Sequence, residues 1–116
     1  MSSLNKVMLI GNLGKPPEMK FASTGTAVTT FSVACNEKWK DANGEQKERT
    51  EWVNVVCWKR LAEIANEYLQ KGSKVFIEGK LQTRTWDGND GQKHYKTEVV
   101  ASQMIMLDGK RTDRDA

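Results

Sequence analysis

Residues 51–72 read EWVNVVCWKRLAEIANEYLQKG, and this stretch decides the fold. Its first part alternates as a strand does, with Val53, Val55 and Cys57 on one side. Apolar residues then fall at i, i+3, i+4, i+7 and i+8, which is one stripe of an amphipathic helix: Leu61, Ile64, Ala65, Tyr68 and Leu69. Gly72 marks the predicted end of that helix. The stretch therefore predicts a strand that leads directly into a helix.

Further strands are expected on both sides of this unit, over residues 4–10, 26–35, 74–86 and 95–101. A short return passes through Lys20 and Phe21, and residues 104–107 form a short apolar segment. In the strand over 74–86, alternation sends Val75, Ile77 and Leu81 toward the core. Residues 36–50 are predicted to be a long charged hairpin loop, and residues 87–91 close a second hairpin. Five strands with one helix between the third and fourth define an all-β OB-fold, a five-stranded Greek-key barrel.

The first strand contains an unbroken apolar run from Val7 to Ile10. A strand of an antiparallel protein usually has one wet face, so we expect its outer face to contact another subunit. Residues 1–107 are assigned to one domain, and residues 108–116 to a polar, disordered tail.

Composition excludes several classes of protein. The net charge is only +3, so any anion-binding surface must arise by collecting basic residues on one face. No membrane span or signal peptide is expected, which predicts a cytoplasmic protein. The two cysteines, Cys35 and Cys57, are interpreted as buried free thiols. With no CxxC motif and a single histidine, His94, the sequence predicts no metal, no cofactor and no enzyme.

Four tryptophans carry the functional signal. Alternation places Trp52 and Trp58 on the non-core face of one strand, and Arg84 and Trp86 on the non-core face of another. Trp39 belongs to the first hairpin loop, which is expected to fold over the same face as the second. Exposed indoles beside cations can stack on unpaired bases while the cations hold phosphates. Eight cations are candidates for those contacts: Lys38, Lys40, Lys47, Arg49, Lys59, Arg60, Lys71 and Arg84. A protein–protein interface is the alternative interpretation of the same face.

The chain also resembles the bacterial single-stranded DNA-binding protein family, on motifs that occur in the family's order across residues 4 to 107. These are Asn5-Lys6-Val7, Gly11-Asn12-Leu13-Gly14, Thr50-Glu51-Trp52, Leu61-Ala62-Glu63, Tyr68-Leu69-Gln70-Lys71-Gly72-Ser73, Val75-Phe76-Ile77-Glu78-Gly79, Thr83-Arg84-Thr85-Trp86 and Thr97-Glu98-Val99-Val100.

The resemblance implies a homotetramer that binds single-stranded DNA without sequence preference in replication, recombination and repair, in the cytoplasm at the nucleoid. It places stacking residues at Trp39, Trp52, Trp58 and Trp86, and basic contacts at Lys6, Arg60, Lys71 and Arg84. RNA is disfavoured by the resemblance only, because stacking does not distinguish the two sugars.

The sequence departs from the family's pattern at three places. Asn54 stands where a basic residue can occur, so one phosphate contact is expected to be missing. Val53 stands where a histidine affects subunit assembly in some members. The family usually continues to an acidic tip that recruits partner proteins, and this chain ends at Asp115-Ala116, so no such recruitment is expected of it.

Overall fold

The structure, a computed structural model, describes residues 2–107 as six strands and one helix. In chain order these are β1 (Val7–Leu13), β2 (Glu18–Phe21), β3 (Ala27–Lys40), β4 (Gln46–Trp58), α1 (Lys59–Tyr68), β5 (Lys74–Asp87) and β6 (Lys93–Met106). The predicted polar tail, residues 108–116, lies outside the described residues.

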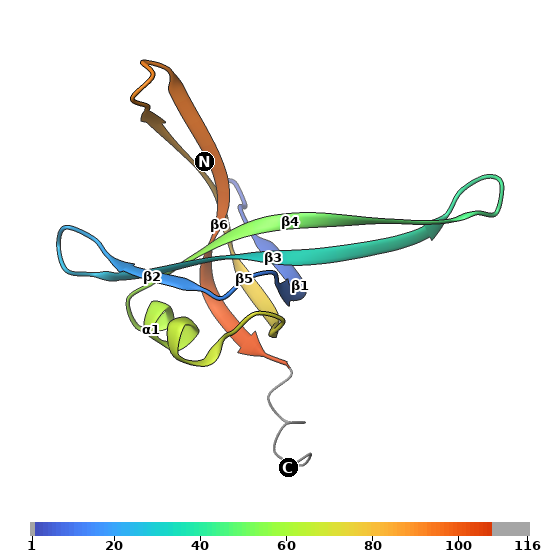
Figure 1. Ribbon diagram of the computed structural model, residues 1–116, viewed down its shortest axis with the longest axis horizontal. Helices are drawn as coiled ribbons and strands as arrows, with labels where there is room; N and C mark the ends of the chain where they lie inside the picture. The colour runs from blue at the N-terminus through green and yellow to red at the C-terminus, as the bar shows by residue number, and fades with distance from the viewer. Residues whose placement is uncertain (1, 108–116) are drawn as a thin grey trace, which may run out of the picture.

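The strands close into a barrel, which confirms the predicted OB-fold (Figure 1). β5 pairs with β1 and β6, β6 runs parallel to β4, and β4 pairs with β3. The ring closes where Asn12 and Leu13 of β1 meet Ala34 and Val33 of β3. β2 pairs with an earlier part of the same β3 edge, residues 27–30. β1 and β2 thus pair with successive parts of one edge of β3, and the short return through Lys20 and Phe21 is a sixth strand.

The barrel interior is filled by the inward side chains that alternation predicted, with one error. Val33, Val55, Val75 and Ile77 are fully buried, but Leu81 is 49% exposed. The β5–β6 ladder has an irregularity beside Gly79, where a Cβ would lie 2.1 Å from the Val100 carbonyl oxygen. Leu81 lies past this point on β5. Because the hairpin leaves the barrel there, alternation alone places Leu81 wrongly in the core.

In chain order, helix α1 follows β4 and precedes β5. In space it packs against β3 and β4. Ala62 and Ala65 are buried, and the Thr29 hydroxyl donates to the Ala62 carbonyl at 2.7 Å. Tyr68, which the stripe placed inward, is exposed, because it is the last residue of the helix; Ala62 faces the core instead. The chain then turns through Gly72, whose φ of 90° favours glycine.

Strand β1 starts and ends three residues later than predicted. It buries one face only: Val7 and Leu9 pack against the core, whereas Met8 and Ile10 are 61% and 53% exposed. One chain therefore buries only the inner face, and the outer face is left open for the subunit contact that the sequence predicts. Ile10 pairs with Phe76 of β5, which pairs with Ile105 of β6, so an apolar row crosses three strands. We call Met8, Ile10, Phe76 and Ile105 the outer apolar face.

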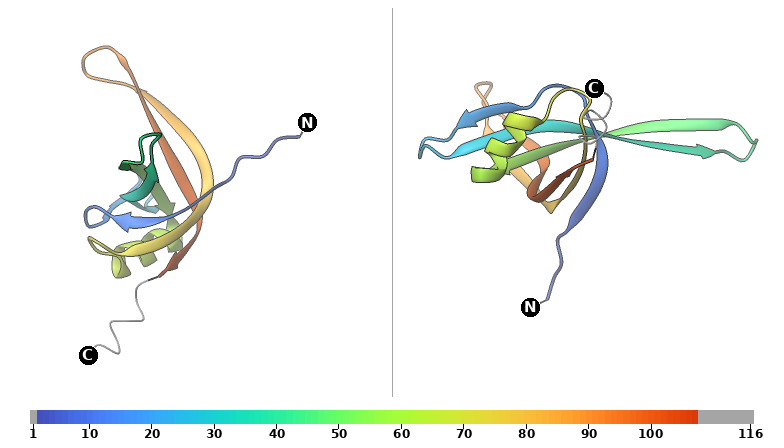
Figure 2. Two further views of the ribbon diagram at one scale, coloured as in Figure 1. Left: turned by 90° about the vertical axis from the view of Figure 1, so that its right-hand side faces the viewer. Right: turned by 90° about the horizontal axis from the view of Figure 1, so that it is seen from below.

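Two hairpins extend far beyond the barrel (Figures 1 and 2). Residues 36–50, predicted to be a loop, form an unbroken antiparallel ladder as far as Lys40 and Gln46. Residues 82–98 form the second ladder, and β6 runs on to Met106, well past the predicted end at Ala101. We call them the β3–β4 arm (36–50) and the β5–β6 arm (82–98). The β3–β4 arm contains charged cross-strand pairs such as Glu37 with Arg49 and Lys38 with Glu48, so its sequence lacks the apolar alternation by which strands are recognised.

The remaining predictions concern cysteines, metals and membranes. Both cysteines are free; Cys57 is buried, and burial raises the pKa of its thiol to about 12, but Cys35 is only partly buried. Within residues 2–107, no cluster of three or more metal-ligating side chains occurs. Over the same range, no helix has the length and apolar character needed to cross a membrane.

Candidate nucleic-acid interface

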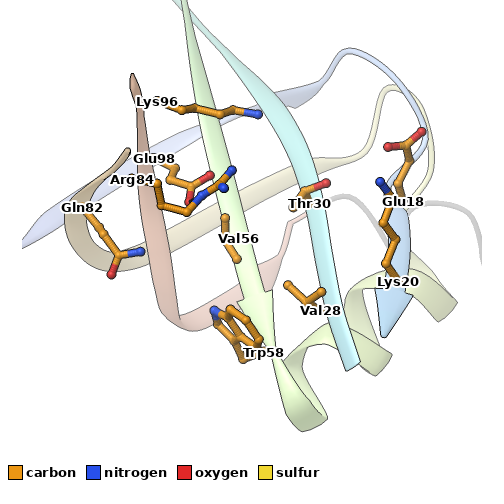
Figure 3. Close-up of a pocket in the computed structure, with 10 residues that line it drawn as sticks. All are labelled: Glu18, Lys20, Val28, Thr30, Val56, Trp58, Gln82, Arg84, Lys96 and Glu98. Atoms are coloured by element: carbon orange, nitrogen blue, oxygen red, sulfur yellow. Dashed lines mark hydrogen bonds and ion pairs between the residues drawn. The ribbon is translucent and has the colours of Figure 1, made fainter. Parts of the chain in front are cut away.

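A groove runs over the outer surface of β3 and β4, between β2 on one side and β5 and β6 on the other (Figure 3). One part of it has a volume of about 450 Å³. Both charged and apolar side chains line this part: Glu18, Lys20, Val28, Thr30, Val56, Trp58, Gln82, Arg84, Lys96 and Glu98. A second hollow continues it past Lys15, Ser32 and Asn54, and Ser32 also lines a third hollow beside Trp52. Together these hollows form one track, which we call the groove.

Trp52 and Trp58 mark the two ends of the groove. Both belong to β4 and project from the same face, six residues apart, which is roughly 20 Å along a strand. They are 55% and 43% exposed, an unusual state for indoles. The sequence prediction that these two share the non-core face is therefore consistent with the observed register, in which Trp52 lies opposite Ala34 and Trp58 opposite Val28.

The glycine motif of β1 explains how Trp52 is held. A Cβ at Gly14 would lie 2.5 Å from the Trp52 ring, so the indole occupies the space that a side chain would need. A Cβ at Gly11 would lie 2.3 Å from the Ala34 carbonyl oxygen, at the point where the barrel closes. One glycine of this motif therefore serves barrel closure and the other serves the groove.

Trp58 is fixed by a sharp turn from β4 into α1. Lys59 follows it with a φ of 56°, a left-handed conformation that costs a non-glycine residue about 1 kcal/mol. Arg60, one residue further, is exposed and pairs with Glu63 at 3.2 Å. The turn therefore presents the indole at the end of the groove with a cation close to it in the chain.

Arg84 joins the groove to the β5–β6 arm. Its Nε donates to Glu98 Oε1 at 2.7 Å, and its guanidinium carbon lies 5.4 Å from the centre of the Trp86 ring. The Glu98 residue is only 3% exposed, whereas the Arg84 side chain is half exposed. A buried carboxylate thus holds a solvent-facing cation in a charge-assisted hydrogen bond.

Trp86 is covered in part by its cross-strand partner, His94. Their rings stack with centres 5.6 Å apart and planes 20° apart. His94 Nε2 also lies 3.2 Å from Asp90 Oδ1, in the turn of the arm. The Gln92 backbone N–H, and then the His94 side chain, hold the pKa of the Asp90 carboxyl below its ordinary value of 3.8. This network orders the tip of the arm next to an indole that is still 44% exposed.

Among the described residues, three of the predicted site residues lie away from the groove. Lys6 forms an ion pair with Glu78 at 3.2 Å, in a hollow beside β5 and β6 that also includes Leu4. Lys71 lies in the turn after α1. Trp39 lies on the β3–β4 arm beneath Arg49, whose guanidinium carbon is 6.0 Å from its ring centre. By alternation, Trp39 shares the side of β3 that faces the barrel interior, opposite to the groove face.

Sequence reasoning also missed groove residues, chiefly Lys96 and Glu98 of β6. Lys96 lies opposite Arg84 across the hairpin. The predicted turn at residues 87–91 therefore contained the information needed to pair these two residues. Once Arg84 is assigned to the non-core face, the same register places its partner Lys96 there, together with Glu98 two residues on. Lys15 and Lys20 lie in the connection to β2 and in β2 itself, where the sequence pattern was weak.

An OB-fold barrel with exposed indoles and cations along one groove defines the class of oligonucleotide-binding β-barrel domains. Comparison with known proteins narrows the class. The chain belongs to the single-strand binding protein family, whose model matches residues 4–107. The resemblance in the sequence motifs is thereby confirmed.

Curated relatives agree with this assignment. The single-stranded DNA-binding protein of Neisseria meningitidis serogroup A is 49% identical over 108 residues, which cover 93% of this chain and 62% of the relative. Single-stranded DNA-binding protein 1 of Chlorobaculum tepidum is 51% identical over 108 residues, covering 92% of this chain and 67% of that protein. The chain thus spans about six tenths of the length of the Neisseria protein.

Solved structures share the fold. One is described as Plasmodium falciparum SSB in complex with ssDNA: the TM-score is 0.85 at 39% identity, over 93% of this chain and 98% of that one. A deletion mutant of the single-stranded DNA binding protein from Thermus aquaticus gives a TM-score of 0.80 at 31% identity, over 92% of this chain and 52% of that one.

Proposed function

We propose that this chain binds single-stranded DNA without sequence preference, and protects it in replication, recombination and repair. The observation that carries the proposal is the groove itself: two exposed indoles, Trp52 and Trp58, stand at its ends and cations line it between them. The chain is a member of the single-strand binding protein family, and relatives named for single-stranded DNA binding support the same conclusion.

In the proposed mechanism the indoles bind bases and the basic side chains bind phosphates. Every base has a π-face, so stacking on Trp52, Trp58 and Trp86 tolerates any sequence and contributes about 1–3 kcal/mol per base. Arg84 and Lys96 lie beside the groove, where phosphates would pass. A base that stacks on an indole is unavailable to its complementary strand, which is how binding without catalysis protects the single strand.

The contacts away from the groove belong to the same proposal. Arg60 follows Trp58 closely and extends the basic track. Lys6, Lys71 and Trp39 are proposed as contacts for strand that has left the groove and continues around the molecule. We assign the binding domain to residues 1–107, as the sequence predicted.

A fluorescence titration tests the proposal. Oligo-dT should quench tryptophan emission, and the affinity should fall steeply with salt, because each phosphate contact releases counterions. Absence of quenching at low salt would rule out the groove as a DNA site and favour the protein-interface alternative. Tighter binding of oligo-rU than of oligo-dT would assign the groove to RNA instead.

The outer apolar face supports a second proposal, that the chain forms a homotetramer. Met8 and Ile10 are more than half exposed in one chain, and patches of this kind usually mark an interface. Light scattering should give four times the 13.1 kDa chain mass. Ile10→Glu should lower that mass by placing a charge in the interface. A monomeric wild-type chain would contradict the proposal.

The proposed place of action is the cytoplasm, at the nucleoid, where single-stranded DNA arises. Imaging of a tagged chain before and after replication arrest tests this. Foci on the nucleoid that increase on arrest are expected, and a diffuse signal in both conditions would contradict it.

A further inference from the structure

Glu98 is a carboxylate at the floor of a groove that we propose binds a polyanion, and nothing in the stacking mechanism uses it. The Glu98 residue is 3% exposed, and it lies two residues from Lys96 on β6. Burying a carboxylate is unfavourable unless a partner compensates for the lost water. Here the partner is Arg84, whose Nε lies 2.7 Å from Glu98 Oε1 (Figure 3).

We infer that Glu98 is a positioning residue for DNA binding, which acts through Arg84. This inference rests on the proposed function of the groove. The bond uses the Nε–H of Arg84, so it leaves the two terminal amino groups of this half-exposed side chain to bind a phosphate. The same guanidinium lies over Trp86. Glu98 therefore fixes the cation and supports the orientation of the indole through one contact.

The negative charge of Glu98 has a second consequence. A phosphate at the groove floor would approach a buried carboxylate and be repelled, whereas a neutral base would not. The sugar–phosphate backbone is therefore directed to the rim, where Arg84 and Lys96 lie, and the bases are directed to the indoles. Positioning and repulsion make opposite predictions for removal of Glu98, which makes the role testable.

The test compares Glu98→Ala, Glu98→Gln and Glu18→Ala by oligo-dT titration at several salt concentrations. Glu98→Ala should bind about fivefold more weakly, although it removes a negative charge from the groove, because Arg84 loses its anchor. Glu98→Gln keeps an oxygen that accepts the Arg84 Nε–H, so it should recover wild-type affinity or exceed it. Glu18→Ala removes an exposed charge from the same groove and should tighten binding slightly.

A double variant separates positioning from a general loss of structure. In the Arg84→Ala background, Glu98→Ala should no longer weaken binding and should strengthen it, because only the repulsion remains. Equal weakening in both backgrounds would show that Glu98 does not act through Arg84. Tighter binding by Glu98→Ala alone would also overturn the inference, since the carboxylate would then be a repulsive charge only.

A measurement on the wild-type chain covers the case in which Glu98→Ala does not fold. The NMR signal of the Arg84 Nε–H should exchange slowly with water both in the free protein and in the oligo-dT complex. Fast exchange in the complex would show that the bond breaks on binding, and would overturn the inference. If the wild-type chain does not bind oligo-dT at all, the proposed function fails first.

Discussion

The two arms have nearly the same backbone but different surroundings. Each ends in a five-residue turn, Asp41–Glu45 or Gly88–Gln92, with the same pair of backbone hydrogen bonds and a glycine at φ 81°. Each carries one tryptophan beneath an arginine of the same arm. They differ in the acidic partner of that arginine. Arg49 forms an ion pair with the exposed Glu37 within its arm, whereas Arg84 forms one with the buried Glu98 at the groove.

Both arms hold as many acidic as basic residues, but these charges are arranged differently. The β3–β4 arm has four basic and four acidic residues, and its Lys47 lies within 4 Å of both Asp41 and Glu45. The β5–β6 arm presents Arg84 and Lys96 side by side on the groove face. The comparison teaches that a tryptophan beside a cation is not sufficient evidence for a binding site. The face of the strand and the anchoring of the cation decide its role.

The largest expected difference between the arms is in stacking. Trp86→Ala should weaken oligo-dT binding about tenfold or more, because an indole that stacks on a base is worth about 1–3 kcal/mol. Trp39→Ala should weaken it less than Trp86→Ala does, because Trp39 lies off the groove face. Fluorescence titration measures both, with Trp86→Phe as the control that keeps an aromatic face. Equal losses for the two alanine variants would remove the distinction between the arms.

The turn glycines give the next effect. Gly44→Ala and Gly91→Ala each place a side chain at φ 81° with nothing within 4 Å of the new Cβ, so only backbone strain changes. Each should lower the stability of its arm by about 1 kcal/mol, as measured by hydrogen exchange of the arm amides. Gly91→Ala alone should also weaken oligo-dT binding. A binding loss confined to Gly44→Ala would reverse the roles assigned to the two arms.

Salt dependence gives a smaller effect. Lys96→Ala should reduce the slope of log K against log salt by about 0.7, the value for one phosphate contact with a single strand. Lys47→Ala on the other arm removes a cation that already has acidic neighbours, so the slope should stay near that of the wild type. Titrations between 50 and 200 mM salt, roughly the range over which such slopes are measured, distinguish the two. A larger change for Lys47→Ala would place the DNA on the β3–β4 arm.

The smallest effect concerns the pH dependence of the turn in the β5–β6 arm. The pKa of Asp90 is lowered in the folded chain by the Gln92 N–H and by His94, so its contribution to the turn is present above pH 3.8. That contribution is lost as the pH falls through the lower, folded pKa. The Gln92 amide signal should therefore move only below about pH 4, and Asp90→Asn should abolish the movement. A midpoint at or above 3.8 would contradict the proposed network.

The barrel was predictable because its signals are local. Alternation in residues 51–58 identifies the third of the five predicted strands, which is β4 of the structure, and the helical stripe directly after it identifies α1. The position of the helix among the strands identifies the OB-fold. Alternation also placed Trp52 and Trp58 of β4, and Arg84 of β5, on the face opposite to the core. Leu81 and Tyr68 were assigned wrongly, because periodicity does not show where a barrel or a helix ends.

The β3–β4 arm and part of the groove were not predicted in this way. Residues 36–50 form strands through cross-strand charge pairs such as Glu37 with Arg49, a pattern that resembles a polar loop in sequence. Glu98 looks like an ordinary surface acid until the β5–β6 register places it under Arg84. The predicted hairpin at residues 87–91 implies this register, but composition and alternation within a single strand do not show it.

The β3–β4 arm also has a consequence for solubility. Within the described residues, its two strands pair only with each other over residues 36–50, so both leave a free edge in water. Free edges invite pairing with strands of other molecules and hence aggregation. The three lysines, the one arginine and the four acidic residues along the arm would be buried unpaired by such an approach. The charged residues of the arm therefore protect a long exposed ribbon from pairing with neighbouring molecules.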